Sequence, residues 1–160
     1  ESIQLAPMVE EIFTDLTPLA EKSGITLELA GDGVMTGSDA LIYRMIFNLT
    51  ENAIKYNRPD GSVQVCITQE PEKLLILVSD TGRGIPEEYQ QSIFQPFFRV
   101  DKSRSRTFGG AGLGLALVWE IAALHGGSVR VAESSDSGTT IAAELPRSGN
   151  HAADPKNETL

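Results

Sequence analysis

Residues 62–80 read SVQVCITQEPEKLLILVSD, and this stretch contains two strand patterns separated by a turn. Val63, Val65 and Ile67 alternate along the first pattern, and residues 74–78 form an apolar run of strand length. Pro71 lies between the two runs, where a turn is favoured. We therefore predict a β-hairpin of strands 62–69 and 73–80, which is the beginning of an antiparallel sheet.

The elements predicted on either side of this hairpin complete an α+β domain. Before it we expect a helix, a short strand and a second helix, at 7–22, 25–29 and 38–56. After it we expect a short helix, a longer helix and a final hairpin, at 86–94, from about Gly112 to about His125, and at 128–145. Pro18 should kink or split the first helix, and Ser38 should be the N-cap of the second. Helices combined with a mainly antiparallel mixed sheet predict a two-layer α/β sandwich.

The composition indicates one folded domain. A chain of 160 residues that is 41% hydrophobic can bury a single core. We assign residues 1–146 to this domain and expect residues 147–160 to be a polar, disordered tail, because they contain few apolar side chains. The formal net charge of -9 argues against nucleic acid as a partner, because binding to phosphates needs a basic face.

The helix predicted at 38–56 carries the first candidate site residues. Its apolar side chains step by four, three and four residues and form a core stripe: Ile42, Ile46, Leu49 and Ala53. A polar stripe lies beside it: Asn48, Asn52 and Lys55. An amide oxygen can ligate Mg2+ and an ammonium group can bind phosphate, so the stripe suggests a metal and phosphate site. For two asparagines taken alone, a solvated or backbone-capping role remains the more common alternative.

A second candidate site follows the apolar run at 74–78, where residues 80–86 read DTGRGIP. Asp80 can accept a hydrogen bond from an exocyclic amine. Gly82 and Gly84 lack side chains and allow the close approach of a flat ligand. A tight turn that uses Asp and Gly only for backbone geometry is the alternative.

A third candidate site is glycine-rich and basic. Its glycines lead into an apolar helix, whose first N–H groups can bind phosphate oxygens: Gly109, Gly110, Gly112 and Gly114. Its cations come just before: Arg99, Lys102, Arg104 and Arg106. A flexible linker beside a solvated surface is the alternative, but a lid that closes on a triphosphate fits both features.

Taken together and in order, these motifs resemble the catalytic domain of sensor histidine kinases. Residues 48–56, NLTENAIKY, look like the N box of that family, and residues 80–84, DTGRG, look like its first glycine box. Residues 94–99, FQPFFR, resemble its F box, and residues 110–116, GAGLGLA, its second glycine box. The final hairpin, with GTT at 138–140 and Leu-Pro at 145–146, resembles the closing glycine segment.

The resemblance implies a Bergerat-type ATP-binding fold and assigns roles to individual residues. Asn52 would bind Mg2+ with Asn48 beside it, and Asp80 would select the adenine amino group. A catalytic set would act at the phosphates: Asn48, Lys55, Arg99 and Arg104. The nucleotide contacts would be Asn52, Tyr56, Asp80, Gly82, Gly84, Ile85, Phe97, Gly110, Gly112, Leu113, Gly114, Leu115 and Thr139.

The same resemblance implies a phosphotransfer reaction. The γ-phosphoryl group of Mg-ATP would pass to a histidine on a separate dimerisation domain and then to the receiver domain of a response regulator. His125, for which we favour a helix-capping role, and His151 lack the sequence context of the acceptor. We expect the parent protein to be a membrane-anchored homodimer and this chain to be a monomeric cytoplasmic portion of it.

Two other readings compete with the histidine kinase. A standalone serine kinase of the anti-sigma-factor type resembles the same fold and length, but such proteins generally lack a full F box. A nucleotide-binding interaction module without catalysis is the second. The presence of Asn52, Asp80 and the lid glycines counts against it.

Overall fold

The computed structural model describes residues 1–96 and 115–148. In chain order the elements are β1 (Ser2–Gln4), α1 (Leu5–Lys22), β2 (Thr26–Gly31), β3 (Val34–Thr36), α2 (Asp39–Lys55), β4 (Ser62–Gln69), β5 (Lys73–Asp80), two short 3-10 helices, η1 (Glu87–Tyr89) and η2 (Ser92–Phe94), α3 (Leu115–Leu124), β6 (Ser128–Ser135) and β7 (Gly138–Pro146). Among these residues, no helix is both long enough and apolar enough to cross a membrane.

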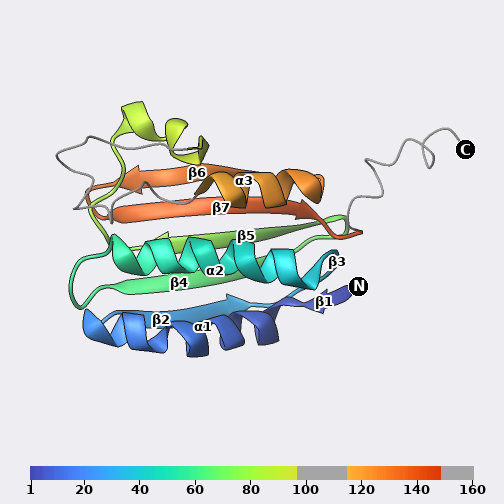
Figure 1. Cartoon of the computed structure of the whole chain (residues 1–160), viewed down its shortest axis with the longest axis horizontal. Coiled ribbons are helices and arrows are strands. Elements are labelled where there is room, and N and C mark those ends of the chain that lie inside the picture. The colour runs from blue at the N-terminus through green and yellow to red at the C-terminus, as the bar shows by residue number, and fades with distance from the viewer. Residues whose placement is uncertain (97–114, 149–160) are drawn as a thin grey trace, which may run out of the picture.

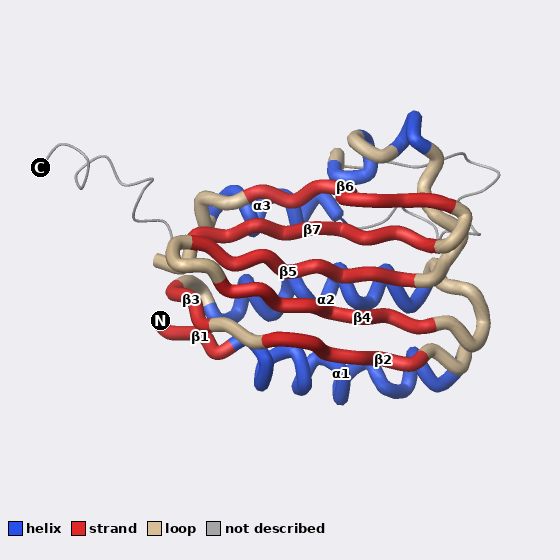
Figure 2. Tube along the Cα trace, turned by 180° about the vertical axis from the view of Figure 1, so that it is seen from behind, coloured by secondary structure: helices blue, strands red, loops and turns tan. Residues whose placement is uncertain are grey.

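Within the described residues, the main sheet has five strands in the order β2-β4-β5-β7-β6. Only β2 and β4 are parallel, and the other neighbouring pairs are antiparallel. Helices α1, α2 and α3 lie side by side on one face of this sheet (Figure 1). Seen from behind, the other face carries no helix from the described part of the chain (Figure 2). The predicted two-layer α/β sandwich with a mainly antiparallel mixed sheet is confirmed.

The hairpin at the centre of the sheet has the predicted strand limits. Val65 pairs with Val78, and Ile67 pairs with Ile76. These four side chains are at most 3% exposed and face the helices. Burying an aliphatic side chain contributes roughly 1.5–3 kcal/mol, so the alternation that predicts the strands also anchors them to the core.

Helix α2 fits the sheet through the predicted apolar stripe. Ile42, Ile46, Leu49 and Ala53 are all buried, at 5% exposure or less. Ser38 is the N-cap, as predicted, and its hydroxyl accepts a hydrogen bond of 3.3 Å from the N–H of Leu41. The stripe and the cap together fix which face of α2 is left for the polar residues.

Of the two effects predicted for Pro18, a kink or a split, the split does not occur, because helix α1 runs through Pro18 as one element. Pro18 lacks the N–H that would bond to the carbonyl of Thr14, and both residues are exposed to solvent. Water can therefore satisfy the carbonyl, while Ile12, Leu16 and Ala20 hold the opposite face in the core. The expected short helix at 86–94 is also different, since this segment forms η1 and η2.

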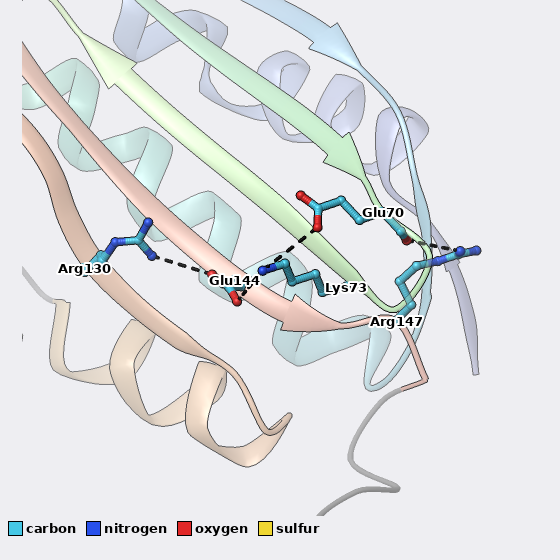
Figure 3. Close-up of polar contacts among 5 residues, drawn as sticks. All are labelled: Glu70, Lys73, Arg130, Glu144 and Arg147. Carbon is cyan, nitrogen blue, oxygen red and sulfur yellow. Dashed lines mark hydrogen bonds and ion pairs between the residues drawn. The ribbon is translucent and has the colours of Figure 1, made fainter.

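The end of the sheet near Lys73 and Arg147 is closed by polar contacts. The Arg147 guanidinium donates to the carbonyls of Val34, Glu70 and Pro71 at 3.3–3.4 Å. Figure 3 shows Arg147 beside Glu70, and Lys73 and Arg130 near Glu144. The main chain of Arg147 also bonds to Thr36 and Glu72. Arg147 therefore belongs to the folded domain and not to the tail that we expected from this residue on; residues 149–160 lie outside the described residues.

His125 links two helices at this same end. Its Nε2 accepts a 3.1 Å hydrogen bond from the N–H of Ser38, so Nδ1 carries the proton and donates to the carbonyl of Ile121 at 2.8 Å. His125 thus caps the end of α3, as predicted. It also satisfies an N–H group at the beginning of α2.

Candidate functional site

A cavity opens between α2 and α3, beyond the end of β5. The empty space in the cavity and at its mouth, open solvent included, is about 540 Å³. Its lining is mainly apolar with a few polar side chains: Leu49, Asn52, Ala53, Tyr56, Val78, Asp80, Arg83, Gly84, Ile85, Leu115, Thr139 and Ile141. Apolar walls with a few converging polar groups are suited to a flat, partly polar ligand.

Asp80 is the charged acceptor of this cavity. It is the last residue of β5, and its Oδ1 accepts hydrogen bonds from the N–H groups of Gly82 at 2.8 Å and Thr139 at 3.2 Å. Burial raises the pKa of the Asp80 carboxyl group, and these two N–H groups oppose the shift. Oδ2 receives no hydrogen bond from the described residues. Asp80 therefore presents one unused acceptor to the cavity.

The loop after Asp80 is held by close backbone contacts. Gly84 has a φ of 85°, and a Cβ at this position would lie 2.1 Å from the carbonyl oxygen of Ser135. A Cβ at Gly82 would lie 2.4 Å from the carbonyl oxygen of Tyr56. The sequence predicts that Gly82 and Gly84 allow a ligand to approach closely. In the structure, their missing side chains leave room for the backbone carbonyl oxygens of Tyr56 and Ser135. Of the two glycines, only Gly84 lines the cavity.

Helix α2 and its C-cap bring two predicted residues to the cavity, Asn52 and Tyr56. Burial, together with the nearby Glu51, raises the pKa of Tyr56 to about 12, so its hydroxyl is neutral at physiological pH. Lys55 lies 3.9 Å from Glu51, with 43% of its side chain exposed. Asn48 is half-buried, and neither it nor Lys55 is among the residues that line the cavity.

Seven of the predicted nucleotide contacts meet around this cavity: Asn52, Tyr56, Asp80, Gly84, Ile85, Leu115 and Thr139. Seven other residues to which the resemblance assigns roles lie outside the described residues: Phe97, Arg99, Arg104, Gly110, Gly112, Leu113 and Gly114. His151, which lacks the sequence context of the acceptor, lies outside them too.

The sequence did not predict five lining residues: Leu49, Ala53, Val78, Arg83 and Ile141. Four of them are apolar and carry only the signal of core residues. That these core residues also line the cavity follows only from the three-dimensional arrangement of the helices and strands. Arg83 lies within the glycine motif at 80–86 and could have been found there.

Comparison with known proteins points to one family. Residues 37–149 match the family described as histidine kinase-, DNA gyrase B- and HSP90-like ATPases. The sensor-like histidine kinase SenX3 of Mycolicibacterium smegmatis is 40% identical over 91% of this chain, and the sensor histidine kinase RppB of Synechocystis is 34% identical over 89%. The chain spans 38% and 32% of the length of these two relatives.

Solved structures agree with the sequence relatives. The nucleotide-free catalytic domain of histidine kinase ThkA has a TM-score of 0.80 and 25% identity, and covers 92% of this chain and 99% of its own. The mycobacterial sensor histidine kinase MprB has a TM-score of 0.79 and 27% identity, and covers 93% of this chain and 98% of its own. The predicted resemblance is confirmed: this chain belongs to the family of histidine kinase-, DNA gyrase B- and HSP90-like ATPases, as an ATP-binding domain of the sensor histidine kinase type.

Proposed function

We propose that the cavity holds the adenine base of Mg-ATP and that the chain presents the γ-phosphoryl group to a histidine on another domain. The observation that carries this proposal is the unused Oδ2 of Asp80 within apolar walls. An exocyclic amino group can donate to this oxygen. Leu49, Ala53 and Ile141 provide apolar surface for the faces of the ring.

The residues around the cavity also fit a divalent metal that arrives with the nucleotide. The described residues contain no group of three or more His, Cys, Asp or Glu that could form a metal site without other ligands. Mg2+ binds readily through a few protein oxygens, with phosphates and water as its other ligands. Asn52 would supply an amide oxygen, with Asn48 one helical turn before it. The metal would neutralise charge on the phosphates.

The transfer needs little chemistry from this domain beyond positioning. A neutral imidazole already has a nucleophilic lone pair, so no strong base is required to activate it. Lys55, Arg99 and Arg104 are our candidates for contacts with the phosphates. His125 is unsuited as the acceptor, because it is 6% exposed and both ring nitrogens already make hydrogen bonds.

The acceptor and the next partner are therefore assigned to other domains. We propose a dimerisation domain that carries the histidine and a response-regulator receiver domain that takes the phosphoryl group from it. ThkA has been solved in complex with the response regulator protein TrrA. We place this chain on the cytoplasmic side of a membrane-anchored parent protein.

Calorimetric titration with ADP, in Mg2+ and in EDTA, tests the nucleotide and metal assignments separately. The wild-type chain should bind ADP more tightly in Mg2+ than in EDTA. Asn52→Ala should reduce this difference to about twofold or less, because one metal ligand is lost. Gln64→Ala, at an exposed position on β4, is the matched control and should keep the wild-type difference.

Two outcomes would count against the proposal. If neither ADP nor ATP binds the wild-type chain, the cavity is not a nucleotide site. If the isolated chain incorporates labelled phosphate on histidine in stoichiometric yield, the acceptor lies within it and the assignment to another domain is wrong.

A further inference from the structure

A row of three polar residues crosses the sheet beside the cavity. Asp80 on β5 pairs with Thr139 on β7, and Thr139 pairs with Ser134 on β6. The N–H of Thr139 donates to Asp80, and the hydroxyl groups of Thr139 and Ser134 lie 2.9 Å apart. Thr139 lines the cavity, whereas Ser134 stands behind it and does not.

Either hydroxyl could donate in the hydrogen bond between Ser134 and Thr139, and one further contact favours Ser134 as the donor. The N–H of Ile85 donates to the Oγ of Ser134 at 2.8 Å. Ser134 still has its hydroxyl hydrogen to donate, and among the described residues the Thr139 hydroxyl is the acceptor within reach. With Ser134 donating, the hydroxyl hydrogen of Thr139 is left to point elsewhere. Because Thr139 lines the cavity, this hydrogen can be directed into it.

We propose that Ser134 is a positioning residue that makes the Thr139 hydroxyl a hydrogen-bond donor into the cavity. This proposal rests on the nucleotide site proposed above and deepens it. The site then shows an acceptor, Oδ2 of Asp80, next to a donor, the hydroxyl of Thr139. A base edge that fits has an amino group beside an unprotonated ring nitrogen, which is the edge of adenine.

The arrangement separates two recognition steps. Asp80 reads the amino group, and the Ser134–Thr139 pair reads the neighbouring ring nitrogen. In 1-deaza-ADP a C–H group replaces that nitrogen while the amino group stays. In the diphosphate of purine riboside the amino group is absent while the nitrogen stays. The two analogues therefore probe the two steps one at a time.

The test is calorimetry with ADP and both analogues, in Mg2+, on three single variants. The wild type should bind ADP about five- to tenfold more tightly than 1-deaza-ADP, the effect of one hydrogen bond. Ser134→Ala frees the Thr139 hydroxyl to turn, and the preference should fall to about twofold or less. The preference for ADP over the purine riboside analogue should stay at its wild-type value, because Asp80 is unchanged. Ser128→Ala, at an exposed position on the same strand, should leave both preferences unchanged.

A purely structural role for Ser134 gives a different pattern. If Ser134→Ala weakens all three ligands equally, or retains the preference over 1-deaza-ADP, the proposal is wrong. Thr139→Val removes the same donor directly, and in the double variant its effect on the preference should not add to that of Ser134→Ala. Additive effects would contradict the coupling.

The outcome for the wild type distinguishes this proposal from the one on which it rests. A wild-type chain that binds ADP and 1-deaza-ADP equally well overturns only the role of Ser134 and Thr139. A wild-type chain that binds neither overturns the nucleotide site itself.

Discussion

The two ends of the sheet differ in how fully their polar side chains are hydrogen-bonded within the fold. At the end near Lys73, His125 uses both ring nitrogens within the fold, and Arg147 donates to three carbonyl oxygens. At the other end, Asp80 is half-buried, with one carboxylate oxygen satisfied and the other open to the cavity. The first end is arranged for stability. The second keeps a charged acceptor at a cost in folding free energy, which is expected of a binding site.

The largest effect should come from Asp80→Asn. Two N–H groups, from Gly82 and Thr139, hold the side-chain oxygen on their side, so the new NH2 group must face the cavity. A donor would then meet the amino group of adenine. We expect the affinity for ADP, measured by calorimetry, to fall about 100-fold or more, the effect of losing a charged hydrogen bond and leaving donors unpaired.

The stability of the same variant should move in the opposite direction. Removing a partly buried charge should leave the melting temperature of the nucleotide-free chain unchanged or raise it. A variant that loses ADP binding only because it unfolds would show a lower melting temperature, and Asp80 would then be a structural residue.

At the closed end of the sheet, which is the end near Lys73, His125→Ala should lower the stability without changing the affinity for ADP. The substitution removes a side chain that is 6% exposed and leaves the N–H of Ser38 without its acceptor. We expect the free energy of unfolding in urea to fall by about 2–3 kcal/mol. Leu124→Ala, at the neighbouring position with 63% exposure, should change it by less than about 0.5 kcal/mol. Loss of ADP affinity in folded His125→Ala would show that the two ends are coupled.

The affinity for nucleotide and the stability of the chain should both depend on pH through Asp80. If Asp80 accepts from the adenine amino group as proposed, nucleotide binding needs its carboxylate form, and burial raises the pKa of this group. Affinity should therefore fall as the pH drops through this raised pKa, by up to about tenfold per pH unit below it. The effect on stability has the opposite sign: protonation is easier in the folded chain, so the contribution of Asp80 to stability decreases as the pH rises through the folded-state pKa.

Asp80→Asn serves as the control for both pH profiles. It should lack the Asp80 transition in melting temperature, and its residual affinity should lack the acidic fall above the range of an ordinary aspartate. Identical stability profiles for the wild type and Asp80→Asn would mean that the raised pKa has no consequence for folding.

Local patterns predicted the centre of the fold but not its small second sheet. Strands β4 and β5 have the predicted limits, because alternation and Pro71 are signals within the strands and their turn. Strands β1 and β3 have three residues each, too few to show a period, and they pair through contacts such as Ile3 with Met35. Such pairing depends on the packing of segments distant in sequence, which a local pattern does not contain.

Some residues of the candidate site could likewise be predicted from local sequence, and others could not. Asn52 and Asp80 could be found from the sequence, because each lies in a motif with a chemical reason for its residue type. Ser134 could not, since a serine in a hairpin has no such motif. Its position opposite Thr139 follows from the strand register, which includes a shift between Val131 and Glu133. Register is set by tertiary packing and turn geometry together.

The smallest effect is expected for the charged pairs at the closed end. The Nζ of Lys73 lies 3.1 Å from Glu144 and 4.0 Å from Glu70, and Arg130 is 3.8 Å from Glu144. These side chains are 36–56% exposed, so water and salt screen the pairs. Lys73→Ala should lower the free energy of unfolding by less than about 0.5 kcal/mol, and less still in 1 M salt. A double-mutant cycle of Lys73→Ala with Glu144→Ala measures the pair itself; a coupling above about 1 kcal/mol would mean that solvent does not screen this pair and that ion pairs stabilise this end alongside His125.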